Sequence, residues 1–122
     1  MDSPKILLIE PNKKESQVLS KLLEERGYNV SCVYNSKDAL EEAEETRFDL
    51  IILEPNMPDA RGDKLFIDLK NIDRQREAPV LALSENDDID YIEDFLKKGI
   101  ADYIIKPYRQ SYLISRIESY IH

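Results

Sequence analysis

Three short runs of the sequence are apolar almost throughout, and they recur between amphipathic segments. The runs are KILLI at 5–9, DLIIL at 49–53 and PVLAL at 79–83. Strands that are apolar at consecutive positions are buried on both faces, which requires a parallel sheet with helices on either side. Segments 28–34 and 102–105 have strand length as well. The sequence therefore predicts an α/β fold on a five-stranded parallel sheet.

An amphipathic helical pattern follows each predicted strand. Asn12, three residues before Glu15, is expected to cap the first helix in a variant of the capping box, and Ser36 to cap the second. Gly27 and Gly99 are expected to end the first and fourth helices. The predicted inward apolar positions are Val18, Leu19, Leu22 and Leu23; Ala39, Leu40 and Ala43; Leu65, Phe66, Leu69 and Ile72; Ile89, Ile92, Phe95 and Leu96; and Leu113, Ile114, Ile117, Tyr120 and Ile121.

The order of the strands follows from one exception in the pattern. Segment 28–34 alternates between polar and apolar residues more than the other strands, as an edge strand does. Right-handed crossovers then favour a doubly wound, flavodoxin-like sheet with the order 2-1-3-4-5. In such sheets the working site lies outside the carboxyl ends of the strands, at the point where the chain direction across the sheet reverses.

Length and composition bound the classes of protein. The chain has 122 residues, so we expect one domain spanning 1–122. The net charge of −8 disfavours binding of nucleic acid or anionic lipid by this domain. No apolar run approaches the ~20 residues of a membrane span, and MDSPK is unlike a signal peptide. Cys32 is the only cysteine. We therefore expect a cytoplasmic protein with no membrane contact.

Polar side chains follow four of the predicted strands at the carboxyl edge of the sheet. Glu10-Pro11-Asn12 follows the first strand and Glu54-Pro55-Asn56 the third, while Ser84 ends the fourth and Lys106-Pro107 the fifth. Carboxylates can hold a divalent cation, and a lysine and a hydroxyl can contact phosphate oxygens. The pattern predicts a site suited to a phosphoryl group with a cation.

The stretches KILLIE, DLIILEPNMPDARG, LALS and GIADYIIKPY carry a family resemblance. Its most specific landmarks are Met57-Pro58, Gly62, and Lys106-Pro107 with Tyr103 three residues before the lysine. Along its whole length the chain resembles a response-regulator receiver domain, the phosphorylation-controlled module of two-component signalling.

The resemblance implies roles for the residues at the strand ends. A receiver's third strand usually ends on an aspartate that accepts the phosphoryl group from a histidine kinase, and here that position is Glu54. In receivers two acids usually follow the first strand and hold Mg²⁺, and here Glu10 and Pro11 occupy those two positions. The resemblance assigns weak metal ligation to Glu10, Glu54 and the backbone carbonyl of Asn56. It assigns the phosphate pocket and switch to Ser84, Tyr103, Lys106 and Pro107, with a cis peptide before the proline and Tyr103 as the aromatic that turns inward on activation.

Two departures from the family pattern weigh against ordinary phosphorylation. Glutamate at position 54 is one methylene longer than aspartate, and a misplacement of about 1 Å can cost ~10²-fold in rate. Pro11 lacks a carboxylate, although Mg²⁺ can be held by only one or two carboxylates with phosphate and water. We therefore expect weak Mg²⁺ binding or none, and no other cofactor.

Three functions compete on this evidence. The first is a pseudo-receiver, a non-enzymatic interaction module in which Glu54, near Ser84 and Lys106, imitates part of a phosphoaspartate. The second is an active receiver that a histidine kinase phosphorylates weakly on Glu54 with Mg²⁺. The third is a nucleotide binder of the same topology, which is disfavoured because EPNKKES lacks the glycine of a phosphate-binding loop.

Simpler structural roles remain open for each of these residues. Glu54 could be a loop acid paired with Lys106, and Glu10 an exposed turn residue. Ser84 could cap a turn or the fourth helix. The acidic run 85–90 is expected to be a solvated loop and helix start, where negative charge favours the helix N-terminus.

The last part of the chain is the expected contact surface. Tyr91 and Tyr112 fall outside the apolar stripes of their helices, so they are expected to be exposed, as interface tyrosines are. Arg116 is assigned to the same surface. The resemblance points to this face too, since many receivers dimerise or bind targets through the fourth helix, fifth strand and fifth helix. The expected partner is a protein, an attached output domain or a second copy of the chain.

Overall fold

A computed structural model describes residues 3–121 and contains a five-stranded parallel sheet. The strands are β1 (Lys5–Ile9), β2 (Asn29–Val33), β3 (Leu50–Leu53), β4 (Val80–Ser84) and β5 (Asp102–Ile105). Their order is β2-β1-β3-β4-β5, and every pairing is parallel. The predicted doubly wound fold with the order 2-1-3-4-5 is confirmed.

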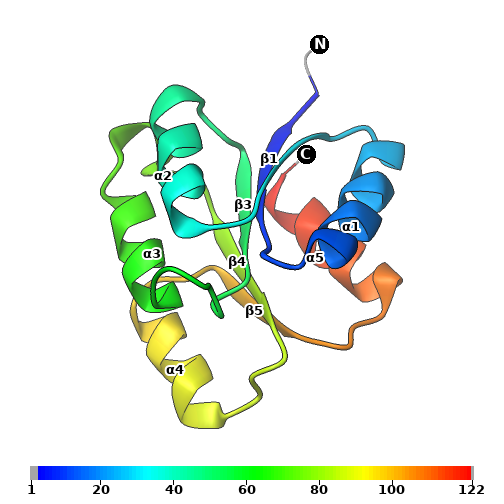
Figure 1. The fold of residues 1–122 in the computed structure, drawn as a ribbon. Coiled ribbons are helices and arrows are strands. Elements are labelled where there is room, and N and C mark those ends of the chain that lie inside the picture. Colours follow the sequence, from blue (N-terminus) through cyan, green and yellow to red (C-terminus); the bar gives the residue numbers. More distant parts are fainter. Residues whose placement is uncertain (1–2, 122) are drawn as a thin grey trace.

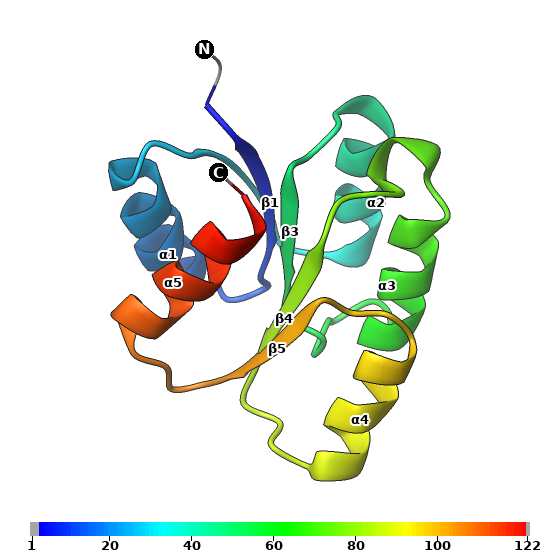
Figure 2. The same ribbon diagram turned by 180° about the vertical axis from the view of Figure 1, so that it is seen from behind.

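Helices cover both faces of the sheet (Figures 1 and 2). They are α1 (Lys13–Glu25), α2 (Ser36–Glu45), α3 (Gly62–Lys70), α4 (Ile89–Lys97) and α5 (Gln110–Tyr120), with a short 3₁₀ turn, η1 (Asp73–Gln75), after α3. Helices α1 and α5 lie on one face, and α2, α3 and α4 lie on the other. No helix within residues 3–121 is long and apolar enough to cross a bilayer.

The central strands supply two separate apolar cores. On β1, Leu7 and Ile9 face the core beneath α2–α4, while Ile6 and Leu8 face the core beneath α1 and α5. All four side chains are at most 1% exposed. Burial on both faces is the physical reason that the sequence of this strand is apolar at consecutive positions.

Capping at the helix starts differs in part from the prediction. Asn12 caps α1 as predicted, since its Oδ1 accepts the N–H of Glu15. The reciprocal half of the capping box is absent, because the N–H of Asn12 donates to Glu10 instead. The predicted cap at Ser36 is wrong: Asn35 caps α2 by accepting the N–H of Asp38, and Ser36 is the first helical residue.

The inward positions of α1 and α4 were predicted incorrectly in part. Val18 is 62% exposed, and on α4 Ile89 is 66% and Leu96 48% exposed. Only Phe95 of α4 is buried. Tyr91, predicted to be exposed, is half-buried, with its ring centroid 5.2 Å from that of Phe95. Two large rings spaced i, i+4 share a helix face, so packing of these rings turned the aliphatic stripe outward.

Candidate functional site

The strand register places Glu10 and Glu54 side by side. Ile9 is paired with Leu53 in the parallel ladder, and the N–H of Glu54 donates to the carbonyl of Ile9 at 2.9 Å. Each glutamate therefore follows its strand at the same level of the sheet edge. Both carboxylates line an open cleft of about 1020 Å³ at the carboxyl ends of the strands.

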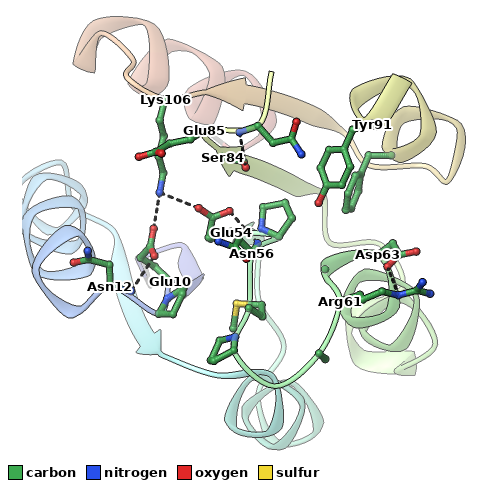
Figure 3. Close-up of a pocket in the computed structure, with 18 of the residues that line it drawn as sticks. Glu10, Asn12, Glu54, Asn56, Arg61, Asp63, Ser84, Glu85, Tyr91 and Lys106 are labelled. Atoms are coloured by element: carbon green, nitrogen blue, oxygen red, sulfur yellow. Dashed lines mark hydrogen bonds and ion pairs between the residues drawn. The ribbon is translucent and has the colours of Figure 1, made fainter. Parts of the chain in front are cut away.

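Lys106 reaches both glutamates from the end of β5 (Figure 3). Its backbone N–H donates to the carbonyl of Ser84, which fixes it beside β4. Its Nζ lies 2.7 Å from Oε1 of Glu10 and 3.3 Å from Oε1 of Glu54. Glu15 of α1 adds a third carboxylate at 3.6 Å. The predicted pairing of Glu54 with Lys106 is confirmed, and the alternative of Glu10 as an exposed turn residue is wrong, because Glu10 is 5% exposed.

The second oxygen of each glutamate is also engaged, in the same way. Oε2 of Glu10 accepts the N–H of Asn12 at 3.0 Å, and Oε2 of Glu54 accepts the N–H of Asn56 at 3.1 Å. The intervening proline has no N–H, so the asparagine supplies the first available donor. We call residues 10–12 and 54–56 the two E-P-N turns. Sequence reasoning noted each tripeptide without connecting them, although their identity was a signal that they act alike.

Burial of this cluster changes the pKa values of its charged groups. The side chains of Lys106, Glu10 and Glu54 are 9%, 7% and 11% exposed. Burial raises the pKa of Glu54, and the hydrogen bond from Asn56 and the charge of Lys106 offset only part of that effect. Burial lowers the pKa of Lys106, but the hydrogen bond to Glu10 and the nearby carboxylates outweigh it, so the pKa is raised in total. Lys106 is therefore a firmly charged ammonium group.

The raised pKa of Glu54 gives a prediction for pH dependence. We expect the pKa of the Glu54 carboxyl group to lie above 4.5, the ordinary pKa of a glutamate. Between 4.5 and the raised pKa the folded domain holds a proton that the unfolded chain releases, so the contribution of Glu54 to stability decreases as pH rises through this window. Carbon-13 NMR of the Glu54 carboxyl against pH measures the midpoint. A midpoint at or below 4.5 contradicts the prediction.

Ser84 and Tyr103 hold the loop between β4 and α4. The Oγ of Ser84 accepts the N–H of Asn86 at 3.1 Å, so Ser84 caps a turn, whereas Asp88 caps α4. The hydroxyl of Tyr103 donates to the carbonyl of Asn86 at 2.6 Å. The Tyr103 ring is half-buried, with its centroid 6.3 Å from that of Phe95. The peptide bond before Pro107 is cis, as the resemblance implied, whereas a turning of Tyr103 on activation stays a prediction.

Tyr91 forms part of the wall that α4 contributes to the cleft. The hydroxyl of Tyr91 points into the cleft (Figure 3). Its pKa is raised to about 12 by burial first, and then by Tyr103, Glu54 and Asp63, whose anionic forms repel a phenolate. Tyr91 therefore lines the cleft, instead of standing on the outer surface as the predicted interface requires.

The other two predicted interface residues have different surroundings. Tyr112 is 51% exposed, as predicted. Arg116 is half-buried and donates from Nε to Asp102 at 2.6 Å, within the same chain. Its guanidinium also lies 5.6 Å from the centroid of the Tyr120 ring. A role for Arg116 in an interface stays a prediction.

Asp59 is a structural residue beside the site that sequence reasoning missed. From the loop between β3 and α3, its carboxylate accepts the N–H groups of Ser36 and Lys37 at the start of α2. These hydrogen bonds lower the pKa of Asp59. An acid near a helix N-terminus is favourable, but no sequence signal joined two segments 23 residues apart.

Comparison with known proteins settles the family. The response regulator receiver domain family matches residues 6–118. This chain is a receiver domain. The receiver domain is 30% identical over 118 residues to the transcriptional regulatory protein CrdR of Helicobacter pylori, covering 97% of this chain and 55% of that protein. It is 31% identical over 115 residues to HprR of Escherichia coli, covering 94% and 50%. It therefore spans about half the length of the curated relatives that it matches.

Solved structures agree with the fold of this receiver domain. A two-component response regulator from Clostridium difficile superposes with a TM-score of 0.91 at 28% identity, covering 98% of this chain and 96% of that one. The receiver domain of the sensor histidine kinase PA1611 from Pseudomonas aeruginosa has a TM-score of 0.88 at 28% identity, with 98% of both chains covered. That structure contains a magnesium ion coordinated in its active site cleft.

The residues of this receiver domain do not fit a divalent cation in the family's manner. Within residues 3–121, no group of three or more His, Cys, Asp or Glu side chains is arranged to hold a metal ion. Both glutamates point one oxygen at an ammonium group and the other at a backbone N–H. Mg²⁺ requires several oxygens at about 2.0–2.1 Å in octahedral geometry. The predicted ligation by Glu10, Glu54 and Asn56 stays a prediction.

Proposed function

We propose that this receiver domain is a pseudo-receiver, a signalling interaction module whose output does not depend on aspartyl phosphorylation. Receiver domains are signal-transduction modules, so the general function follows from the family. The observation that carries the finer proposal is the buried cluster in which Lys106 contacts Glu10 and Glu54 at once.

The position of Glu54 is poor for accepting a phosphoryl group. Phosphoryl transfer depends on holding the attacking oxygen in line and neutralising charge with a metal ion. One oxygen of Glu54 accepts from Asn56 and the other from Lys106, and these hydrogen bonds lower the nucleophilicity of both oxygens. The longer side chain also displaces the oxygen from the place an aspartate provides, at a cost of ~10²-fold or more.

The charges of the cleft also oppose a phosphoryl group. Glu10, Glu15 and Glu54 surround the single ammonium group of Lys106, which already has a surplus of negative partners. A phosphoryl group adds about −1.5 to −2 at pH 7. Among residues 3–121, Lys106 is the one cation that forms ion pairs with Glu10 and Glu54.

Phosphorylation by a small donor tests the proposal directly. We expect the intact mass of the wild-type chain to stay unchanged after incubation with acetyl phosphate and Mg²⁺. Glu54→Asp alone should remain at least ~10-fold slower than the double variant Pro11→Asp/Glu54→Asp, because Pro11 still lacks a metal-binding carboxylate. The double variant, with both acids in place, is the positive control.

Rapid gain of one phosphoryl group by the wild type, on Glu54, would instead establish the alternative. That alternative is an active receiver phosphorylated weakly with Mg²⁺ by a histidine kinase. Rapid labelling of Glu54→Asp alone would show that Pro11 is no obstacle. Labelling of the double variant only is the result that supports a pseudo-receiver.

The face formed by α4, β5 and α5 is the proposed partner surface. Ile89 and Leu96 of α4, Ile105 of β5 and Tyr112 of α5 are all between 42% and 66% exposed. Apolar side chains gathered on one face are typical of interaction sites. Because the curated relatives are transcriptional regulators about twice as long, an attached output domain or a second copy of the chain is the proposed partner. A histidine kinase is the upstream partner in the alternative function.

Self-association provides a test of this surface. We expect Leu96→Arg to weaken dimerisation by at least ~10-fold, since burying an unpaired arginine at an interface is costly. Val18→Arg is the matched control, because Val18 is equally apolar and 62% exposed but lies on α1. Sedimentation equilibrium of the wild type and both variants measures the effect. Equal weakening by the two variants, or a wild type that is monomeric throughout, contradicts a homodimer through this face.

A further inference from the structure

We infer that the two E-P-N turns form a cation site whose resident cation is the ammonium group of Lys106, because Pro11 supplies no second acid to hold a divalent ion beside it. This inference deepens the proposed function and rests on it, because a site that retained a divalent cation could still support phosphoryl transfer. The juxtaposition of the two turns about one ammonium group is its basis (Figure 3).

The turns orient their carboxylates without help from a metal. In each turn the glutamate accepts the N–H of the asparagine two residues on, at 3.0 and 3.1 Å. The proline between them fixes its own φ and offers no competing donor. Each carboxylate is therefore held by its own backbone, with its remaining oxygen, Oε1, directed at Lys106.

The ammonium group lies where a cation between the two acids has to lie. Two glutamates at adjacent strand ends, each nearly buried, repel each other unless a positive charge separates them. Lys106 supplies that charge from 2.7 and 3.3 Å, and its side chain is 9% exposed. A divalent cation bound to the same oxygens would face the Lys106 charge at close range and in surroundings largely shielded from water.

The second acid that would complete a divalent-cation site after β1 is replaced by a proline in this chain. Pro11 follows Glu10 directly, where the family resemblance places a second acid. The next acid, Glu15, lies 3.6 Å from Nζ of Lys106 and is itself about half exposed. The site thus has two fixed carboxylates, enough to hold one ammonium group and short of the oxygen set that Mg²⁺ prefers.

Metal titration of the full chain tests the inference. We expect Mn²⁺ and Mg²⁺ to cause no saturable change in the amide spectrum at Glu10, Asn12, Glu54 and Asn56 of the wild type. Lys106→Met should bind Mn²⁺ at these residues at least ~10-fold more tightly, because a like charge has been removed. Lys14→Met, an exposed lysine of α1, is the matched control and should behave as wild type. The receiver domain of PA1611 is the positive control for the metal.

Each outcome decides the question. Saturable Mn²⁺ binding by the wild type at the E-P-N turns overturns the inference, and so does the absence of any gain in Lys106→Met. If Lys106→Met is unfolded without metal, refolding on addition of Mn²⁺ counts as the gain and failure to refold counts against it. Metal binding by the wild type without phosphoryl labelling overturns this inference and leaves the proposed function standing, whereas labelling of Glu54 overturns the proposed function itself.

Discussion

Replacing Lys106 with methionine is expected to lower the free energy of unfolding by about 3–5 kcal/mol, the usual result of leaving buried charges without their partner. The substitution removes the ammonium group that contacts both Glu10 and Glu54, whose side chains are 7% and 11% exposed. Methionine keeps most of the aliphatic volume, so the loss reports charge and not packing. Urea unfolding followed by circular dichroism measures the difference.

A charge-neutral variant separates the two contributions. Lys106→Met with Glu10→Gln and Glu54→Gln leaves no buried charge in the cluster, so we expect it to recover most of the lost stability. Lys14→Met, on the exposed side of α1, should change stability by less than about 0.5 kcal/mol. A loss in Lys106→Met as small as in Lys14→Met would show that the cluster is effectively solvated.

Replacing Gly62 with alanine is expected to cost about 1–3 kcal/mol, as overpacking of a tight contact does. A Cβ on Gly62 would lie 2.5 Å from both Cα and O of Pro55, so backbone has to move. Pro55 is the middle residue of the second E-P-N turn, and its displacement should also shift the amide resonances of Glu54 and Asn56. The measurement is again urea unfolding, together with the amide spectrum.

The control for Gly62 separates crowding from backbone conformation. Gly27 has a φ of +92° and nothing within 4 Å of an added Cβ, so Gly27→Asn meets open space at a backbone angle that asparagine tolerates better than most residues. We expect a smaller loss there. A Gly62→Ala variant that is as stable as the wild type, with unchanged resonances at Glu54, would contradict close packing of α3 against the turn.

The sheet could be predicted from sequence because strands buried on both faces are apolar at consecutive positions. Runs such as Leu50–Leu53 have no polar face, and segment 28–34 stood out as an edge strand by its alternation. Element bounds agreed to within a residue at most ends: β2 was expected at 28–34 and occupies Asn29–Val33. Local patterns determined these features, so local reasoning reached them.

The orientation of α4 depended on partners distant in sequence, and there the prediction was wrong in part. The pattern of α4 offered two faces about 130° apart, an aliphatic one with Ile89 and Leu96 and an aromatic one with Tyr91 and Phe95. The aromatic face packs inward because Phe95 meets Phe66 of α3 and Tyr103 of β5, at centroid separations of 6.5 and 6.3 Å. Nothing within the segment itself distinguishes the two choices.

For the candidate site, too, the sequence predicted which residues lie together but not their detailed geometry. Sequence position placed Glu10, Glu54, Ser84 and Lys106 at one edge of the sheet, and the structure brings the two glutamates and the lysine into contact. The backbone hydrogen bonds of the E-P-N turns, and the burial that raises the pKa of Glu54, depend on geometry that spacing does not encode.

The bond between Asp59 and the first turn of α2 has a consequence for recognition. It closes the 23-residue separation between Ser36 and Asp59 into a ring that includes the second E-P-N turn. A closed ring has fewer conformations to lose when a partner docks against it. The loop that carries the second E-P-N turn is therefore held at one end by β3 and at the other by this contact, which lowers the conformational entropy that binding against this loop would cost.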